Sequence, residues 1–309
     1  MRGKTLGRIA VIGTGGIGGY YGGLIARAGG DVVFIGRTDV PQLRLRGLEV
    51  RSEVAESFHH NPVEVSERPS QVGVVDLVII ATKTTGNEEV AEWMKPLVGD
   101  NTTILTLQNG LGNDVFFGEK FPNAEIYAGL CFVCLNRIEP GVIHHIGQGH
   151  VTVGCYRGCD GACEDLVNLL CASGIQAKAV DDLAAAQWRK LFWNIPFNGL
   201  AVAGGGIDCA EILSRTGDKV ERLMREVYAV AAALGYDLGD VDSLVAKQIE
   251  ITKNMGPYRP SSLLDYEADR SIELDAIWRL PVERAVEVGV EVPEMRCLLE
   301  ALEAYQAAL

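Results

Sequence analysis

Residues 9–18 read Ile-Ala-Val-Ile-Gly-Thr-Gly-Gly-Ile-Gly, and this stretch decides the expected fold. Apolar residues that favour β-structure end in the spacing Gly13-x-Gly15-x-x-Gly18, and a helical pattern follows at once. This order predicts a strand, a tight turn and a helix N-terminus, the arrangement that holds a dinucleotide pyrophosphate. Gly13 permits the turn, Gly15 lets the phosphates approach the backbone, and Gly18 lets the helix pack closely on the strand. The predicted cofactor-binding loop consists of Gly13, Thr14, Gly15, Gly16, Ile17 and Gly18.

Arg37 follows the next predicted strand, which covers residues 31–36. An NAD site tends to place Asp or Glu there, because a carboxylate accepts hydrogen bonds from the adenosine ribose. A carboxylate would repel a 2′-phosphate, whereas a guanidinium binds it through two parallel hydrogen bonds. Arg37 therefore favours NADPH over NADH as the cofactor. The alternative is a solvated surface arginine beside a structural glycine turn.

The length and composition are those of a soluble globular protein with two domains. The chain has 309 residues, of which 48% are hydrophobic and 22% are charged, and its formal net charge is −13. A diffuse negative charge argues against nucleic acid or an anionic membrane as the main partner. No apolar run approaches the roughly 18–20 residues of a membrane span, so a cytoplasmic location is expected.

The eight cysteines predict neither a disulfide framework nor a metal site. A cytosolic chain of this length does not need disulfides, so free thiols are expected. Cys155, Cys159 and Cys163 are four residues apart, yet Gly158 and Gly161 argue against one continuous helix that would bring them together. The five histidines show no His-Glu-x-x-His pattern, and we expect no metal ion.

The first 180 residues alternate strand and helix patterns, and several strands are nearly continuous apolar runs. Such runs are typical of a parallel sheet that helices cover on both faces. Predicted strands cover residues 9–12, 32–35, 63–65, 77–81 and 103–107, and predicted helices cover 86–98 and 113–121. Three β-like runs follow at 126–135, 142–146 and 151–155, separated by turn-forming Pro140-Gly141 and Gly147-x-Gly149, which predicts an antiparallel extension of the sheet. A helix over 163–172 and a strand over 176–180 complete this part.

The β-like pattern ends near residue 181. Helical patterns then cover residues 183–200, 210–234, 241–252, 272–289 and 293–308, whereas 264–269 is ambiguous. We therefore predict an α/β fold, with a Rossmann-like NADP-binding domain over residues 1–181 and an all-α substrate and catalytic domain over residues 182–309.

A polar stripe on an otherwise apolar helix is the strongest sign of chemistry. The polar stripe consists of Lys190, Asn194 and Asn198, whose spacing of four places them along one helical face. The residues between them are mostly apolar, so the helix should be largely buried and its ammonium and carboxamide groups need partners. Those partners are either a structural network or a polar ligand, and the pattern leaves both open. Pro196 should bend the helix near Phe192.

Four further residues lie where a ligand could reach them. Lys83 and Asn109 each follow a predicted strand, and the carboxyl ends of such strands line the ligand crevice of an open α/β sheet. Asn109 equally suits a turn with Gly110. Ser261 could donate a hydrogen bond to a carboxylate, and Glu273 could pair with a lysine. Helix capping and a solvated glutamate are the alternatives for these two residues.

Together and in this order, these elements resemble the ketopantoate reductases (2-dehydropantoate 2-reductases), and the resemblance covers nearly the whole chain. The glycine loop is its generic part, and the polar stripe joined to Ser261 and Glu273 is its specific part. The stretch Arg137-Ile-Glu-Pro-Gly-Val-Ile-His144 also looks like that family.

The resemblance implies NADPH-dependent reduction of the 2-keto group of ketopantoate to (R)-pantoate, a step toward pantothenate and coenzyme A. Hydride arriving at a ketone carbon builds negative charge on the oxygen, and an ammonium beside that oxygen stabilises the charge and delivers a proton. The resemblance implies that Lys190 is this general acid. It implies that Glu273 orients the substrate hydroxyl or the lysine, so both residues are expected to be catalytic.

The resemblance also implies the residues that bind substrate and cofactor. Asn194 and Asn198 match positions that hold the polar groups of the substrate and the catalytic lysine. Ser261 matches a position that contacts the substrate carboxylate. Lys83 and Asn109 match positions near the nicotinamide, and Asn109 is expected to contact both cofactor and substrate.

The chain departs from the family pattern near the expected substrate pocket. Family members often carry Met and then Gln-Asp after the serine, where this chain has Ser262 and Leu264-Asp265, and Pro196 is unexpected in the catalytic helix. These departures leave two alternatives, a reductase of another 2-keto acid and a non-catalytic NADPH-binding sensor. The expected partner is therefore a small 2-keto acid. The abundant apolar helix surface makes a homodimer a further candidate.

Overall fold

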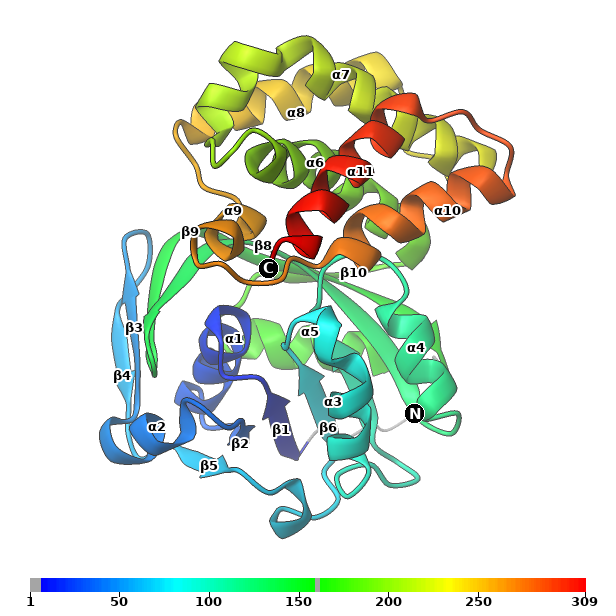
Figure 1. The fold of residues 1–309 in the computed structure, drawn as a ribbon. Coiled ribbons are helices and arrows are strands. Elements are labelled where there is room, and N and C mark those ends of the chain that lie inside the picture. Colours follow the sequence, from blue (N-terminus) through cyan, green and yellow to red (C-terminus); the bar gives the residue numbers. More distant parts are fainter. Residues whose placement is uncertain (1–6, 159–161) are drawn as a thin grey trace. The chain divides into compact units, whose positions relative to one another are not determined.

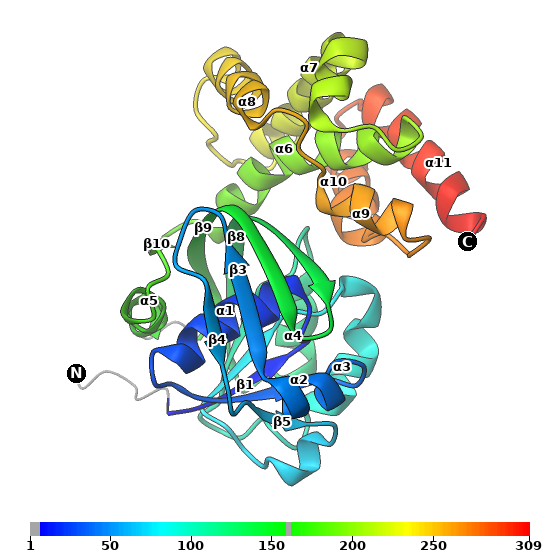
Figure 2. The ribbon, with the colours of Figure 1, turned by 90° about the vertical axis from the view of Figure 1, so that its left-hand side faces the viewer.

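The computed structural model describes residues 7–158 and 162–309, and its internal contacts divide the chain into two units. The first unit contains Met1–Gln108 and Asn113–Leu183, and the second contains Asn109–Gly112 and Ala184–Leu309. The short segment Asn109–Gly112 therefore belongs by its contacts to the second unit, although it lies in sequence within the first. Figure 1 and Figure 2 show the elements of each unit from two directions.

A ten-stranded sheet forms the centre of the first unit. The strand order is β4-β3-β9-β8-β7-β6-β1-β2-β5, with β10 paired to β9, and only the β3–β4 and β8–β9 pairs are antiparallel among the pairs described. The strands are β1 (Arg8–Ile12), β2 (Asp31–Ile35), β3 (Leu48–Ser52), β4 (Phe58–His60), β5 (Glu64–Ser66), β6 (Leu77–Ile80), β7 (Thr103–Thr106), β8 (Glu125–Glu139), β9 (Val142–Arg157) and β10 (Ala177–Val180). The central strands β6 and β7 are buried along their whole length, and β1 is buried from Ile9 to Ile12, as a parallel sheet between helices requires.

Helices contribute to two apolar clusters in this unit. The helices are α1 (Gly16–Arg27), α2 (Val40–Arg46), α3 (Asn87–Met94), α4 (Asn113–Lys120) and α5 (Ala162–Ala172), with 3₁₀ turns at Pro69–Gln71 and Thr84–Gly86. One cluster joins α1 and α5 to the sheet through residues such as Tyr21 and Leu166, and the other joins α3 and α4 through Met94 and Phe117. Alternate residues of the same strands enter different clusters, because successive side chains of a strand point to opposite faces.

The long β8–β9 hairpin differs from the prediction of three short strands. Both strands run without a break, and register shifts between Phe132 and Val133 and between Cys134 and Leu135 absorb the irregularity. The predicted turn at Gly147-x-Gly149 is therefore wrong. Gln148 and Gly149 have positive φ values of 58° and 126°, and they form an irregularity inside β9 rather than a chain reversal. The antiparallel extension of the sheet is confirmed.

The second unit is helical and has its own core. Its helices are α6 (Leu183–Ala203), α7 (Cys209–Ala233), α8 (Val241–Met255), α9 (Ser261–Glu267), α10 (Leu280–Glu287) and α11 (Pro293–Ala307), with a π-helical turn at Asp275–Arg279. Phe197, Trp278 and Leu298 lie in one buried cluster with side chains of α7. The predicted fold class, an α/β unit followed by a helical region, is confirmed.

The helices of the second unit follow the predicted pattern with one irregularity. The helix expected over residues 272–289 runs without a break from Leu274 to Glu287 and contains the π-helical turn Asp275–Arg279 ahead of α10. Most of the ambiguous segment 264–269 lies in helix α9, which begins at Ser261. Helix α6 continues through Pro196, and the bend expected near Phe192 stays a prediction.

The cysteine prediction is partly wrong. Cys131, Cys134, Cys163, Cys171, Cys209 and Cys297 are free thiols, whereas Cys155 is disulfide-bonded. Cys159 lies outside the described residues. Within the described ranges, no group of three or more His, Cys, Asp or Glu residues is arranged to hold a metal ion. No helix of the described ranges combines the length and hydrophobicity that crossing a membrane requires.

Candidate active site

The glycine loop joins β1 to α1 in the first unit, and each glycine of the motif has its own geometric reason. Gly13 has a φ of 96°, and a Cβ there would lie 2.9 Å from the backbone of Ala81. Gly18 lies against the turn itself, because a Cβ there would be 1.9 Å from the carbonyl oxygen of Gly13. Gly15 differs from both. It is the N-cap of α1 with a φ of −69°, and no atom lies within 4 Å of the position its Cβ would occupy.

The open position at Gly15 fits a bound pyrophosphate. Packing within the fold does not require glycine at this position. A phosphate group that lies against the backbone would require it, because a Cβ would occupy the same space. The first N–H groups of α1 begin at Gly16 and have no partner within the helix, as at every helix N-terminus. The loop therefore has the donors and the space that a dinucleotide needs.

Arg37 lies just after β2 and is exposed. Its guanidinium donates two hydrogen bonds to Glu89 of α3, with Nη1–Oε1 and Nη2–Oε2 distances of 2.6 and 3.1 Å. It also lies over the ring of Trp93, 5.2 Å from the ring centre. Arg37, which is predicted to bind the 2′-phosphate, thus contacts a carboxylate and an aromatic ring of the same helix.

Lys83 lies at the carboxyl end of β6, where it precedes the 3₁₀ turn and is exposed. The side chain of Gln108, just past β7, links this end to α3. Its Nε2 donates to Thr82 Oγ1 and to Asn87 Oδ1, at 3.3 and 2.8 Å. The loops after β6 and β7 are therefore fixed to each other beside Lys83.

One charged contact near the glycine loop was not predicted. Arg137 of β8 forms an ion pair with Asp39, which is fully buried and lies two residues after Arg37. The backbone N of Arg137 is 3.9 Å from the position of a Cβ on Gly16. Arg137 therefore reaches from the start of α1 to the loop after β2. The family-like stretch that begins with Arg137 was the available signal, but only the fold brings it to this loop.

Helix α6 carries the polar stripe of the second unit. Lys190, Asn194 and Asn198 are all buried, together with the apolar side chains between them except Trp193, which is partly buried. The Lys190 ammonium donates a hydrogen bond to Asn109 Oδ1 at 2.8 Å. Asn109 belongs to the segment that joins this unit through its contacts, so strand-end reasoning alone could not predict its partner.

The Asn109 segment is also fixed to the π-helical turn. Leu111 N donates to the carbonyl oxygen of Ala276 at 2.8 Å. Gly110 has a φ of 82°, and a Cβ there would lie 2.4 Å from the same oxygen. Glycine is therefore required at 110, and the segment connects the surroundings of Lys190 to the turn that begins two residues after Glu273.

The other end of the stripe contacts the start of α9. Asn198 Oδ1 accepts hydrogen bonds from Ser261 Oγ and from the backbone N of Ser262, at 3.3 and 3.1 Å. The N-cap of α9 is Pro260, and Ser261 is the first helical residue, so the serine does not cap the helix. The structure thus brings two of the predicted substrate ligands, Asn198 and Ser261, into direct contact.

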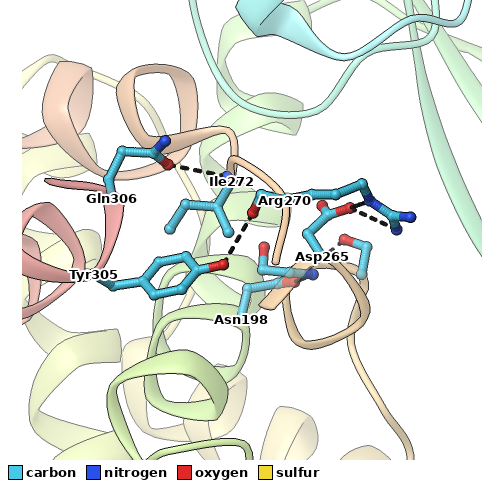
Figure 3. Close-up of polar contacts among 8 residues, drawn as sticks. Asn198, Asp265, Arg270, Ile272, Tyr305 and Gln306 are labelled. Atoms are coloured by element: carbon cyan, nitrogen blue, oxygen red, sulfur yellow. Dashed lines mark hydrogen bonds and ion pairs between the residues drawn. The ribbon is translucent and has the colours of Figure 1, made fainter. Parts of the chain in front are cut away.

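Glu273 is buried two residues before the π-helical turn begins, and hydrogen bonds hold Arg270 and Ile272, which precede it (Figure 3). Tyr305 of α11 donates to the carbonyl oxygen of Arg270 at 3.0 Å, and Gln306 accepts from the N of Ile272 at 3.1 Å. The Arg270 guanidinium pairs with buried Asp265. Sequence reasoning missed these supports, because nothing in the spacing of α11 indicates a contact with residues 270–272.

Burial raises the pKa of the Tyr305 hydroxyl, and the nearby carboxylates of Asp269 and Asp265 raise it further. The hydroxyl therefore stays protonated at neutral pH and remains a donor to Arg270.

The predicted residues thus form two sets. The glycine loop, Arg37 and Lys83 belong to the first unit, and the polar stripe, Asn109, Ser261 and Glu273 belong to the second. The first set has the donors for an anionic dinucleotide, and the second has a buried ammonium with carboxamide, hydroxyl and carboxylate groups. Such groups can bind a small anion with a reacting oxygen and supply a proton to it.

Comparison with known proteins identifies the family. The family model for ketopantoate reductase PanE/ApbA matches residues 9–158, and the model for the C-terminal part of that family matches residues 182–306. A 2-dehydropantoate 2-reductase of a Nostoc species is 35% identical over 304 residues, covering 96% of this chain and 94% of the relative.

Solved structures agree with this match. The 2-dehydropantoate 2-reductase of Geobacter metallireducens has a TM-score of 0.91 and 37% identity, with 96% of this chain and 99% of that chain covered. A D-mandelate dehydrogenase in a ternary complex with NADH and anilino(oxo)acetate has a TM-score of 0.88 and 25% identity, with 97% and 99% covered. Family members thus use nicotinamide cofactors. Since two family models match in order over most of its length, the chain belongs to the ketopantoate reductase family and is an oxidoreductase of that family.

Proposed function

We propose that this protein reduces 2-dehydropantoate to (R)-pantoate with NADPH, a step in the formation of pantothenate and coenzyme A. One observation carries the proposal most directly: buried Lys190 donates a hydrogen bond to Asn109, at one end of a stripe whose other end contacts Ser261 through Asn198. Matches to 2-dehydropantoate 2-reductases from Nostoc and Geobacter support the choice of substrate.

The first unit would bind the cofactor, and we propose that the cofactor-binding domain covers residues 1–181. The loop from Gly13 to Gly18 would bind the pyrophosphate at the N-terminus of α1, and Arg37 would bind the 2′-phosphate. Lys83 and Asn109 would lie toward the nicotinamide. When bound, NADPH supplies a hydride to the keto carbon of the substrate.

The second unit would bind the substrate and supply the proton, and we propose that this substrate and catalytic domain covers residues 182–309. Lys190 would stabilise the negative charge that develops on the keto oxygen and then protonate it. Asn109 holds the ammonium at 2.8 Å and so fixes its direction. Asn194, Asn198 and Ser261 would bind the polar groups of the substrate, and Glu273 would orient the substrate hydroxyl or Lys190.

Replacement of Lys190 tests this assignment. Lys190→Met removes the proton donor, and we expect kcat with ketopantoate to fall by about 10²–10⁴-fold, the usual contribution of a general acid. The dissociation constant for NADPH should stay within about twofold of wild type, because Lys190 is assigned to the substrate. Arg189→Met is the matched control: Arg189 is an exposed cation one position away that donates to the carbonyl of Leu238. Unchanged turnover in Lys190→Met would contradict the assignment.

A reductase of another 2-keto acid is the second candidate, and the similarity to a D-mandelate dehydrogenase with bound NADH favours it. Ser262 and Leu264, which follow Ser261, are the positions at which the sequence was expected to depart from the family pattern. The two candidates differ in kcat/KM across a panel of ketopantoate and aromatic 2-keto acids. The panel should include the keto acid that corresponds to mandelate. A non-catalytic sensor would bind NADPH and turn over none of them.

We also propose a homodimer. The ketopantoate reductase of Staphylococcus aureus, a member of the same family, is described as dimeric. Light scattering after size-exclusion chromatography would give twice the chain mass of 33.3 kDa for a dimer and the single mass for a monomer.

A further inference from the structure

We propose that Glu89 limits the preference of this protein for NADPH over NADH, because its carboxylate competes with the 2′-phosphate for Arg37. The inference rests on the proposed use of NADPH and adds a residue that the motifs do not indicate. It concerns α3 and the loop after β2, both in the first unit.

The contact between the two side chains has the geometry of a bidentate pair. Two nitrogens of Arg37 donate to the two oxygens of Glu89 at 2.6 and 3.1 Å. Trp93 lies four residues after Glu89 on α3, which places both on the same side of the helix. The Trp93 ring lies 5.2 Å from the guanidinium carbon. Helix α3 therefore contacts the guanidinium through both an edge and a face.

A 2′-phosphate would bind the edge that Glu89 already occupies. Carboxylate and phosphate both engage the fork of an arginine through two parallel hydrogen bonds, so they compete for the same nitrogens. The Trp93 contact uses the face of the guanidinium and is compatible with either anion. NADPH binding would therefore displace Glu89 or share Arg37 with it.

This competition weakens the binding of NADPH and leaves the binding of NADH unaffected. The side chains of Arg37 and Glu89 are 63% and 54% exposed, so the ion pair is weak and a phosphate can break it. After displacement, the Glu89 carboxylate still lies near the phosphate and repels it. NADH has no 2′-phosphate and encounters neither effect. Glu89 should therefore narrow the difference in affinity between the two cofactors.

Glu89→Gln tests the inference, with Glu88→Gln as the matched control. Glu88 is in the same first turn of α3 but pairs with Lys120. Dissociation constants for NADPH and NADH can be measured from cofactor fluorescence at fixed ionic strength. We expect Glu89→Gln to tighten NADPH binding by roughly three- to tenfold, as removal of one nearby exposed charge allows. NADH binding should change by less than about twofold, and Glu88→Gln should change neither.

Arg37→Ala separates failure of this inference from failure of the proposed cofactor. If Arg37→Ala weakens the binding of NADPH and NADH equally, Arg37 does not contact the 2′-phosphate. The proposed role of Arg37 and the proposed role of Glu89 are then both wrong. If Arg37→Ala weakens NADPH selectively but Glu89→Gln leaves the NADPH to NADH ratio unchanged, only the role of Glu89 is overturned. The double variant Arg37→Ala/Glu89→Gln should lose most of the gain in NADPH affinity. A gain that persists there in full would overturn competition for Arg37.

Discussion

Replacement of Gly15 by alanine separates cofactor binding from folding at the loop after β1. The backbone at Gly15 has φ and ψ of −69° and −164°, which alanine adopts, and no atom lies within 4 Å of the new Cβ. Alanine is a poorer N-cap than glycine, at a cost of roughly 0.5–1 kcal/mol. Loss of glycine from the unfolded chain offsets this by about 0.4–1 kcal/mol. We therefore expect Tm to change by less than about 3 °C.

Cofactor binding by Gly15→Ala should be far weaker than that of the wild type. The new methyl group would occupy the space where the pyrophosphate meets the backbone, and such a clash costs about 1–3 kcal/mol. That range corresponds to an increase in the dissociation constant of roughly 5- to 150-fold. NADPH and NADH should lose affinity equally, because both contain the pyrophosphate.

Gly18→Ala provides the contrast. A Cβ at Gly18 would lie 1.9 Å from the Gly13 oxygen, so the loop must shift and the protein itself should lose about 1–3 kcal/mol or more. The assay combines thermal unfolding with fluorescence titration of both cofactors for the two variants. The reasoning is refuted if Gly15→Ala keeps the wild-type Tm and also binds NADPH with wild-type affinity.

Three other predictions concern the second unit. Gly110→Ala forces a Cβ to 2.4 Å from the Ala276 oxygen, so it should displace Asn109 and lower kcat as well as Tm, measured by steady-state kinetics and thermal unfolding. Asp208→Ala removes the capping box at the start of α7 and should lower the free energy of unfolding by about 1 kcal/mol, and Asp208→Ser should restore most of it in urea titrations. Glu226 accepts hydrogen bonds from the N–H groups at the start of α11, and burial raises the pKa of its carboxyl group above the ordinary value of 4.5. The stability that this raised pKa contributes is therefore fully present below pH 4.5 and is lost as the pH rises through the pKa of the folded state. Urea titrations should therefore show Glu226→Gln gaining stability relative to wild type as the pH rises from about 4 to 7, and a constant difference would contradict this.

Local patterns predicted much of the fold. Strands β1, β2, β6 and β7, which are rich in β-branched and apolar residues, and the helices of the second unit other than α9 follow from periodicity and turn residues. Strands β3 and β4 were missed because they are short and partly exposed, so their residues show no buried run. The continuous β9 was missed because Gly147-x-Gly149 looks like a turn, and only pairing with β8 holds it as an irregularity within the ladder.

The sequence allowed the residues of the candidate site to be predicted, but not the contacts that they make with one another. The spacing of Lys190, Asn194 and Asn198 predicted a buried stripe, and the structure has all three buried. The Asn109 partner of Lys190 depends on how a segment of the first part of the chain contacts the second unit, which no local pattern encodes. The Glu89 partner of Arg37 is likewise a contact between residues 52 positions apart.

The central claim is that this protein reduces ketopantoate with NADPH, and a steady-state assay tests it most directly. The measurement is kcat/KM for ketopantoate, from the consumption of NADPH, beside the same quantity for a panel of other 2-keto acids. We predict the highest kcat/KM for ketopantoate. A higher value for another 2-keto acid, or binding of NADPH with no turnover of any of them, would contradict the claim.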